Sequence, residues 1–566
     1  MTNHPRSLLS GRKRALWLAL PVILMVLMTA CGSGNTNKGP TRNYVNIIAY
    51  QTDAWTENFN PYFDATSYTV ASSEGTIYET LLFFNRFDGT YKGMLASSYS
   101  VSSDGMQITF NLRTDVKWSD GQPFTSADVV YTFGKLLKEN DALDVNGLWV
   151  TPTISDVTAP DDHTVIVTLA SPNVDALYSV GGQTWIVPQH IWSTIADPVN
   201  YADTQPVGTG PFMVGSFTPQ LVKMKKNPNY WQPGLPKVQE IRFPAYKDNA
   251  TAELAMNQGN VDWNSIFAPN LQNTFVKRDP AHNHFWFPPS DVLYILVNLT
   301  KSPFDKVEVR QAISLAIDRD QWSKIAESGY ESPASPTGLL PVDQGKYLDP
   351  AYKDLKFTVD TAKAMQLLES IGYKKGSDGI YADAAGNKLS FDFEIPGGYS
   401  DWVAGAPVLA NDLKAIGIEL NVKTVGEDVF YTDVQNGTFE IAMQGTYAGP
   451  SPYNLYSSLL LSTNSAPVGE QANGDWERWN DPQTDALLHQ FVSSSDLTVQ
   501  QQALSGIQKI MVEQLPAIPL TNEPYWYEYN STNFTGWPDQ NNAYALPSPY
   551  QYPDAEIVLL HLQPAS

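Results

Sequence analysis

The chain has 566 residues, of which 42% are hydrophobic and 17% charged, and its formal net charge is −23. This length exceeds what one hydrophobic core supports, so we expect two or three lobes. An acidic surface repels phosphate backbones, which argues against a nucleic-acid partner. The only cysteine is Cys31, so an intrachain disulfide and a thiolate metal site are both excluded.

The first thirty residues have the pattern of a secretory signal. Arg12, Lys13 and Arg14 form a basic segment, and the apolar run at 15–28 is shorter than the ~20 residues of a membrane-spanning helix. The segment LMTAC (27–31) resembles a bacterial lipobox, with Met28 where leucine is usual. We predict a signal peptide at 1–30, lipidation of Cys31 and a flexible tether at 31–43. The alternative is an uncleaved signal anchor.

Strand and helix patterns alternate through the rest of the chain. Apolar residues at every second position predict strands at 107–113, 165–169 and 418–422. Thr125 followed by Asp128 predicts a helix start, and helical spacing predicts helices at 309–317, 360–372, 409–416 and 503–511. This alternation indicates the α/β class.

Seven motifs in order resemble the family 5 extracellular solute-binding proteins, the peptide/nickel group. The longest covers LASSYSV (95–101) to SDGQPFTSADVV (119–130). The others are GTGPF (208–212), NPNYW (227–231), VRQAI with Asp318 and Arg319 (309–319), the helix 360–373, WNDP (479–482) and PAIPL (516–520). Read from the residues alone, most of these are turns and packing elements that mark a fold.

The resemblance implies an α/β, two-lobed periplasmic-binding-protein-like clamp (type II/cluster C) with an extra subdomain. Lobe I would comprise 41–85, 208–290 and 520–566, the extra subdomain 86–207, and lobe II 291–519. The implied protein is a monomeric lipoprotein on the outer face of the cytoplasmic membrane that hands a solute to an ABC permease, with no cofactor.

Enzymatic patterns are missing from the sequence. We find no GxxxxGK[ST], HExxH or GxSxG motif, and the only close histidine pair is His282 and His284. We therefore expect neither an enzyme nor a metal site. The 59 acidic residues leave one alternative open, a secreted glycoside hydrolase with two catalytic carboxylates.

Our prediction of the ligand class depends on a position where this sequence differs from the peptide-binding members of the family. Peptide-binding members typically carry an Asp-Tyr pair whose Asp holds the peptide ammonium, and Gly449 and Pro450 align with that pair. The C-terminal motifs at 534–562 resemble the cellobiose/oligosaccharide-binding branch. We therefore favour a neutral, cello-type oligosaccharide, with an oligopeptide as the alternative.

Aromatic and amide residues in loops beside glycine or proline are our candidate ligand contacts, because such loops commonly carry binding residues. Each of them has an ordinary core or surface position as its alternative. The candidates are Trp55, Asn58, Trp185, Trp402, Tyr447 and Tyr453.

Overall fold

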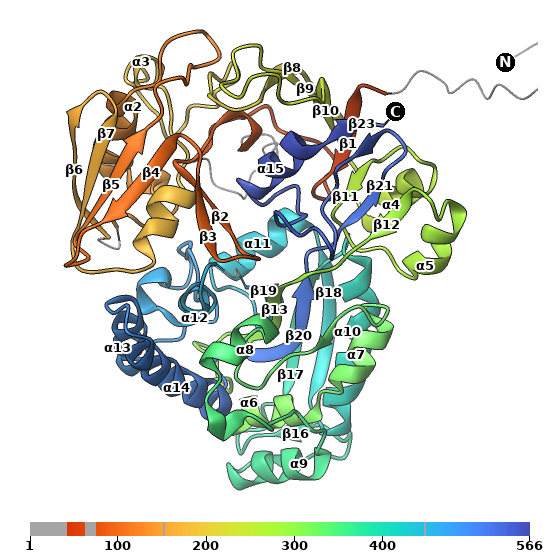
Figure 1. The fold of residues 1–566 in the computed structure, drawn as a ribbon. Helices are drawn as coiled ribbons and strands as arrows, with labels where there is room; N and C mark the ends of the chain where they lie inside the picture. The colour runs from red at the N-terminus through yellow and green to blue at the C-terminus, as the bar shows by residue number, and fades with distance from the viewer. Residues whose placement is uncertain (1–41, 63–74, 151–152, 447–448, 566) are drawn as a thin grey trace, which may run out of the picture. The chain divides into compact units, whose positions relative to one another are not determined.

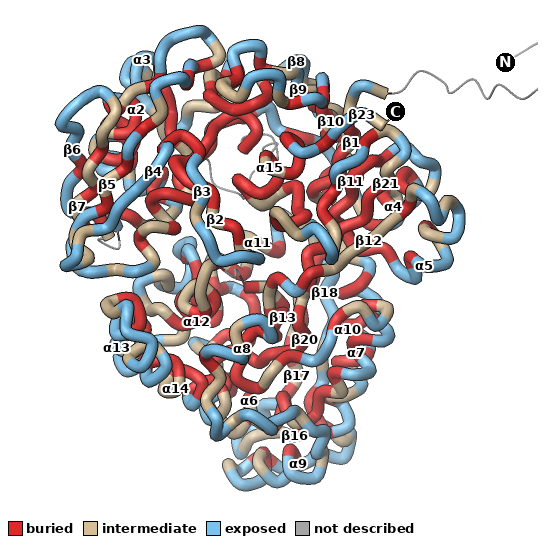
Figure 2. The backbone as a smooth tube through the Cα atoms, viewed as in Figure 1, coloured by how far each residue is buried: buried red, intermediate tan, exposed pale blue. Residues whose placement is uncertain are grey.

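The computed structural model describes residues 42–62, 75–150, 153–446 and 449–565. Within these ranges, three large sheets contain seven, four and six strands, and helices lie against them (Figure 1). Buried positions run along the strands and the inner sides of the helices (Figure 2). None of the described helices is long and apolar enough to cross a lipid bilayer.

The seven-stranded sheet joins distant parts of the chain. Its strand β1 (Tyr44–Ile48) pairs in parallel with both β10 (Glu240–Pro244) and β11 (Trp263–Asn264). The outer strands are antiparallel to their neighbours. They are β8 (Phe212–Thr218), β9 (Leu221–Lys226), β12 (Asn283–Phe285) and β21 (Glu528–Asn530), and the associated helices are α4 (Asn249–Asn257), α5 (Leu271–Thr274) and α15 (Asp554–His561).

The four-stranded sheet is antiparallel throughout and has the order β4-β5-β7-β6. Its strands are β4 (Ala96–Val101), β5 (Gln107–Leu112), β6 (Ile154–Asp161) and β7 (Thr164–Leu169). The predicted strands at 107–113 and 165–169 are confirmed, and their apolar positions are buried. The predicted helix start is also confirmed, since Thr125 and Asp128 form a reciprocal capping box at α2 (Ser126–Tyr131), which continues as a π-helical turn, Thr132–Leu137.

The six-stranded sheet has the order β14-β20-β13-β19-β17-β18. Its long strand β13 (Pro289–Val297) runs antiparallel to β19 (Ile441–Gly445) and to β20 (Ile518–Pro524). The remaining strands are β14 (Ser332–Pro333), β17 (Ser390–Pro396) and β18 (Glu419–Val425). Nine α-helices are interspersed with these strands: α6 (Val307–Ala316), α7 (Arg319–Ile325), α8 (Pro341–Tyr347), α9 (Thr361–Ser370), α10 (Ser400–Ala415), α11 (Glu427–Gln435), α12 (Pro452–Leu460), α13 (Pro482–Val492) and α14 (Leu497–Gln514).

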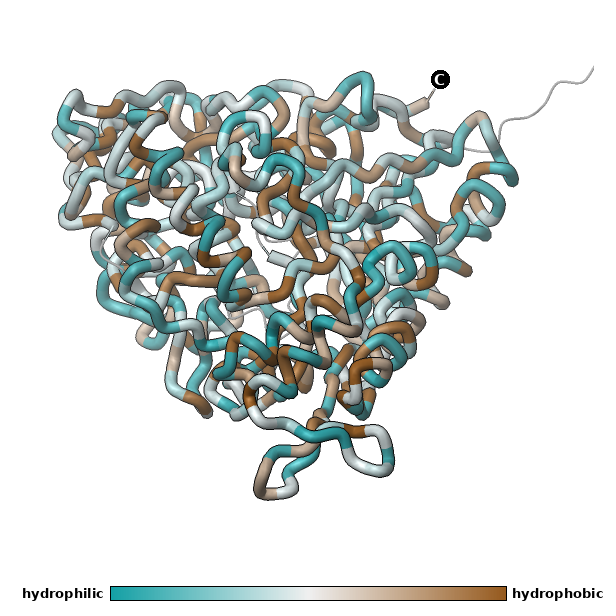
Figure 3. Tube along the Cα trace, turned by 90° about the horizontal axis from the view of Figure 1, so that it is seen from below, coloured by the Kyte–Doolittle hydropathy of each residue, from teal (hydrophilic) through white to brown (hydrophobic). Residues whose placement is uncertain are grey.

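The helices predicted from apolar spacing are confirmed here. The Asp360 side chain accepts a hydrogen bond from the Lys363 amide at the start of α9, as an N-cap should. The helix α10 ends just before Gly417, whose φ of 77° suits glycine. Hydrophobic and hydrophilic positions are interspersed along the trace (Figure 3), as expected for helices with one buried face.

Two neighbouring segments connect the seven-stranded sheet to the six-stranded sheet. Residues 286–288 lead from β12 into β13, and 525–527 lead from β20 into β21. They are hydrogen-bonded side by side, because the Trp286 amide donates to the Tyr527 carbonyl and the Tyr525 amide to the Pro288 carbonyl, each at 3.1 Å. The main chain therefore passes twice between the sheets at one place.

Several short elements lie outside these three sheets. They are the hairpin β2 (Leu82–Asn85) and β3 (Thr90–Gly93), the pairs β15 (Lys374–Lys375) with β16 (Tyr381–Ala382) and β22 (Phe534–Thr535) with β23 (Gln563–Pro564), and the short helix α3 (Gln189–Trp192).

Candidate functional site

A cavity of about 380 Å³ lies beside the two connecting segments. It receives residues from the ends of β1 and β11 in the seven-stranded sheet and from β13, β19 and β20 in the six-stranded sheet. Its volume is within the usual range for small-molecule sites, which commonly lie between domains. A second cavity of about 780 Å³ is lined only by residues 317–359 and Asn522. We take the first as the candidate site because the seven-stranded and the six-stranded sheets both contribute to it.

Aromatic side chains make up much of the cavity wall. Tyr50 stacks on Tyr550 with ring centroids 4.9 Å apart, and Tyr399 meets the edge of Trp402 at 5.3 Å. Such faces suit sugar rings, apolar side chains and cations. The aromatic lining residues are Tyr50, Phe267, Tyr399, Trp402, Tyr431, Trp476, Trp526 and Tyr550.

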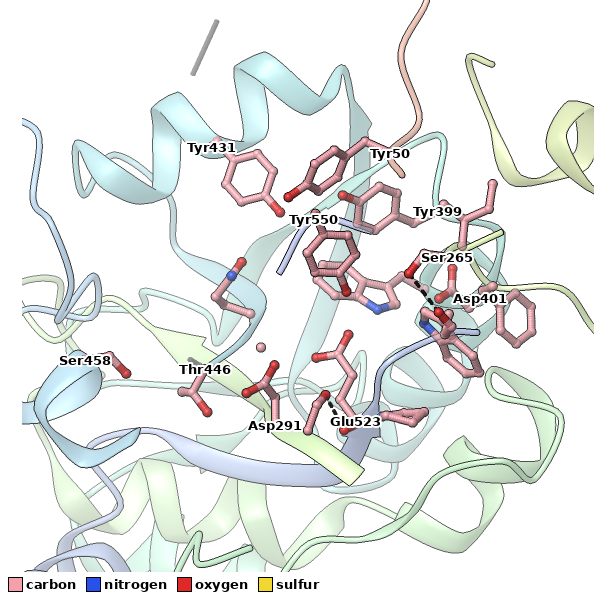
Figure 4. A pocket seen from close by; sticks show the side chains of 18 of the residues that line it. Tyr50, Ser265, Asp291, Tyr399, Asp401, Tyr431, Thr446, Ser458, Glu523 and Tyr550 are labelled. Carbon is pink, nitrogen blue, oxygen red and sulfur yellow. Dashed lines mark hydrogen bonds between the residues drawn. The ribbon is translucent and has the colours of Figure 1, made fainter. Parts of the chain in front are cut away.

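The charged side chains of the lining all have the same sign. They are Asp291, Asp401, Glu477 and Glu523. Within the described ranges, no lysine, arginine or histidine lines this cavity. Figure 4 shows Asp291 and Glu523 close together opposite the tyrosines, and Asp401 beside Ser265. When these carboxyl groups are ionised, the site presents a negative potential to whatever enters it.

Backbone contacts hold the acidic side of the cavity in place. The Ser290 hydroxyl donates to the Glu523 carbonyl at 3.0 Å, and the Ser265 hydroxyl donates to the Trp526 carbonyl at 2.7 Å. On β19, which lies on the other side of β13 from β20, Gly445 leaves room for the Glu523 side chain, because a Cβ there would lie 2.3 Å from its Oε2. Glycine at 445 thus lets this carboxylate lie against β19.

Asp291, Asp401 and Glu523 are here called the acidic group, and two further carboxylates, those of Glu327 and Glu331, lie close enough to act on it. Glu327 is fully buried and neither of its carboxylate oxygens has a hydrogen-bond partner among the described residues, whereas Glu331 accepts a hydrogen bond from the Thr521 hydroxyl at 2.5 Å. Burial raises the pKa of Asp401 to about 7, and burial together with the charge of Asp401 raises the pKa of Glu331 to about 8. Burial and the neighbouring carboxylates raise the pKa of Glu523 as well. A bound cation would relieve this mutual repulsion.

Of the five predicted contacts within the described residues, Trp402 is the one that lines this cavity. Trp55 is 3% exposed and its Nε1 donates to the Phe243 carbonyl at 2.9 Å, and the Asn58 side chain accepts from the Asn60 amide at 2.9 Å. Both belong to the packing around the seven-stranded sheet. Their role in binding stays a prediction.

The other predicted residues lie elsewhere or outside the described ranges. Trp185 meets the edge of Tyr552 at 6.4 Å, and Tyr453 stacks on Phe491 at 6.1 Å. Neither is in the cavity lining. Tyr447 and Cys31 lie outside the described residues.

The acidic group was missed in the sequence because its members are far apart. Asp291, Asp401 and Glu523 come from three segments more than a hundred residues apart, on β13, α10 and β20, and only the tertiary fold brings them together. Gly449 and Pro450, which align with the Asp-Tyr pair of peptide-binding members, are not in the lining of this cavity, although Gly445 and Thr446 are. In the described residues, no group of three histidine, cysteine or acidic side chains could hold a metal ion.

A family model supports the placement of the chain. The model of bacterial extracellular solute-binding proteins, family 5, matches residues 90–467. The chain belongs to this family. A family 5 member is a solute-binding protein, so the expected family and class of function are both confirmed.

Curated relatives of this family 5 chain include two glutathione-binding proteins GsiB. The protein from Shigella flexneri is 27% identical over 454 residues, or 79% of this chain and 83% of the relative. The protein from Pectobacterium atrosepticum is 32% identical over 317 residues, or 55% of this chain and 58% of the relative.

Solved structures share the fold. The oligopeptide-binding protein of Thermotoga maritima with mannohexaose bound has a TM-score of 0.85 at 23% identity, covering 92% of this chain and 98% of that one. The oligopeptide-binding protein AppA of Bacillus subtilis, in complex with a nonapeptide, has a TM-score of 0.76 at 21% identity with the same coverages. The predicted α/β, two-lobed clamp is thereby confirmed.

Proposed function

We propose that this family 5 protein captures a small peptide for an ABC importer and holds the peptide's protonated amino group against Asp291, Asp401 and Glu523. The observation that carries the proposal is the charge of the cavity, which has four carboxylates and no basic side chain in its described lining. An ammonium group without a carboxylate partner is costly to bury, and here the partners are present.

The relatives support a peptide as the solute, and the charge of the cavity restricts which net charge that peptide can carry. Glutathione, named in the GsiB relatives, is a tripeptide with one amino group and two carboxylates. A ligand with an excess of carboxylates would meet only like charges in this lining. The favoured solute is therefore a peptide that is neutral or positively charged overall.

The connecting segments support a clamp mechanism. Within the described part of the chain, the main chain crosses between the seven-stranded and the six-stranded sheets only at 286–288 and 525–527. Such paired crossings are suited to absorb a hinge rotation. The cavity lies between residues of both sheets, so closure would bury the solute between two lobes. The closed form would then be the one presented to the permease.

An oligosaccharide is the second candidate. The T. maritima neighbour was solved with mannohexaose bound, and eight aromatic side chains line the cavity of this chain. Flat ring faces pack well against sugars. The cluster of carboxylates argues against a neutral sugar, because a neutral ligand would not relieve their mutual repulsion.

Attachment through Cys31 is also part of the proposal. It rests on the basic segment at 12–14, the short apolar run and the lipobox-like LMTAC (27–31). A diacylglyceryl group on Cys31 would keep the binding protein beside its permease, because two acyl chains anchor stably whereas one does not.

A thermal-shift screen tests the proposed function. The panel contains free tripeptides, their N-acetylated forms, and cello- and manno-oligosaccharides. A ligand that binds only the folded state raises the melting temperature by mass action. We expect a rise with free peptides that N-acetylation removes. A rise with oligosaccharides alone would favour the second candidate.

A further inference from the structure

A fourth carboxylate of the cavity, Glu477, stands apart from the acidic group of Asp291, Asp401 and Glu523. Glu477 is fully buried, and neither of its carboxylate oxygens accepts a hydrogen bond from another described residue. It lines the cavity beside Ser458 and Leu459 of helix α12. A buried carboxylate without a partner is costly, so its position on a ligand cavity points to a group that the ligand supplies.

The charged neighbours of Glu477 do not provide that partner. Arg478 donates to backbone carbonyls, those of Trp476 at 3.1 Å and Glu470 at 3.3 Å among them, rather than to the Glu477 carboxylate. Asp475 is 1% exposed, and one of its carboxylate oxygens accepts no hydrogen bond within the part of the chain that the structure describes. Burial raises the pKa of Glu477 to about 8, and burial together with the charge of Glu477 raises the pKa of Asp475 to about 10. A cation supplied by the ligand would favour the ionised form of Glu477.

Strand β13 sets the separation between the two acidic ends. Its residue Asp291 lines the cavity at one end and Leu296 lines it further along. Three residues beyond Leu296, the Leu299 amide donates to the Glu477 carbonyl at 3.0 Å. Five residues of extended strand span roughly 17 Å. Asp291 therefore lies near the start of β13, and the Glu477 segment lies just beyond its other end.

We propose that the solute carries two positively charged groups, one held by Asp291, Asp401 and Glu523 and the other by Glu477. This inference rests on the proposed function for the first group and adds the second. Extended residues span about 3.3–3.6 Å each, so a peptide of about three residues with a lysine at its far end has a suitable length. The lining between the ends includes Leu296 and Leu459, which suit an apolar stretch.

Calorimetry with two matched peptides tests the second charge. The probes are the C-terminal amides of Ala-Ala-Lys and Ala-Ala-norleucine, which differ in one ammonium group. We expect the wild-type protein to bind the lysine peptide at least tenfold more tightly. In Glu477→Gln this preference should disappear, whereas the control Glu513→Gln, at an exposed position of α14, should retain it.

The outcomes separate the inference from the proposed function. Equal affinity of the wild type for both peptides, with N-acetylation still weakening both, would overturn the second charge and leave the first site standing. Binding of neither peptide would overturn the proposed function itself. The wild-type comparison decides the matter even where Glu477→Gln fails to fold.

Discussion

The Glu523 carboxylate occupies space that only a glycine at position 445 leaves open: a Cβ on Gly445 would lie 2.3 Å from Glu523 Oε2. The two residues lie on strands β20 and β19, which both pair with β13. The pairing of both strands with β13 thus places a carboxylate against a glycine inside the cavity.

Replacement of Gly445 tests that contact. In Gly445→Ala the Glu523 side chain has to move, which a flexible side chain can do without unfolding the protein. We therefore expect roughly tenfold weaker binding of a free tripeptide, or about 1.4 kcal/mol, measured by calorimetry. Gly426→Ala is the matched control, because a Cβ there meets nothing within 4 Å. Equal losses in both variants would contradict a specific role for the contact.

Neutralising the acidic group should separate binding from stability. Hydrogen bonds to charged groups contribute about 1.5–3 kcal/mol, so Glu523→Gln should weaken binding of a cationic peptide about tenfold to a hundredfold. The same change removes repulsion from Glu331, Asp291 and Asp401 and should raise the melting temperature of the ligand-free protein. A variant that loses both stability and binding would indicate a structural role for Glu523.

The raised pKa values predict how stability depends on pH. Asp401 titrates with a pKa of about 7 in the folded protein, against an ordinary value of 3.8. Between these values the folded state holds a proton that the unfolded state has lost, so this group makes the free energy of unfolding fall as pH rises from about 4 to 7. Urea unfolding at pH 5 and pH 8 should show a smaller difference in Asp401→Asn than in the wild type. An unchanged difference would contradict the assignment.

The titration of these carboxyl groups also predicts how ligand affinity depends on pH. A cation binds the deprotonated carboxylates, so affinity for a free peptide should increase as pH rises through about 7. Calorimetry at pH 5.5 and 7.5 measures this directly, since a peptide amine remains largely protonated at both values. A neutral oligosaccharide has no charge to interact with, and its affinity should change little over this range.

Attachment to the membrane has its own test. Cys31→Ser should move the protein from the membrane fraction into the soluble fraction, because the variant has no site for the acyl chains. Fractionation followed by immunoblotting measures the distribution. Unchanged membrane association would mean that an uncleaved apolar segment, and not a lipid, provides the anchor.

Much of the fold could be predicted from local patterns. The alternation at 107–113 and the capping residue Asp360 are signals carried by neighbouring residues, and both correspond to observed elements. The aromatic Trp402 was found because it follows a glycine-containing loop. Trp55 has a similar loop setting, yet its indole donates into the core, because sequence spacing does not reveal which side of a loop is covered.

The charge of the site could not be predicted in this way. A single carboxylate such as Glu523 has no neighbour in sequence that distinguishes it from other acidic residues. Glu477 becomes a candidate binding residue only because it is buried, which the structure shows. The departure at Gly449 was read as the loss of an ammonium partner. The structure offers other carboxylates, on β13, α10 and β20, that are far apart along the chain.

Mass spectrometry of the solute released from natively purified protein tests the central claim most directly. The protein is purified without denaturant, unfolded in acid, and the released small molecules are identified. We predict a small peptide with a free amino group and no net negative charge. Release of a neutral oligosaccharide or of an anionic solute would contradict the claim that the carboxylates of this cavity select a positively charged group.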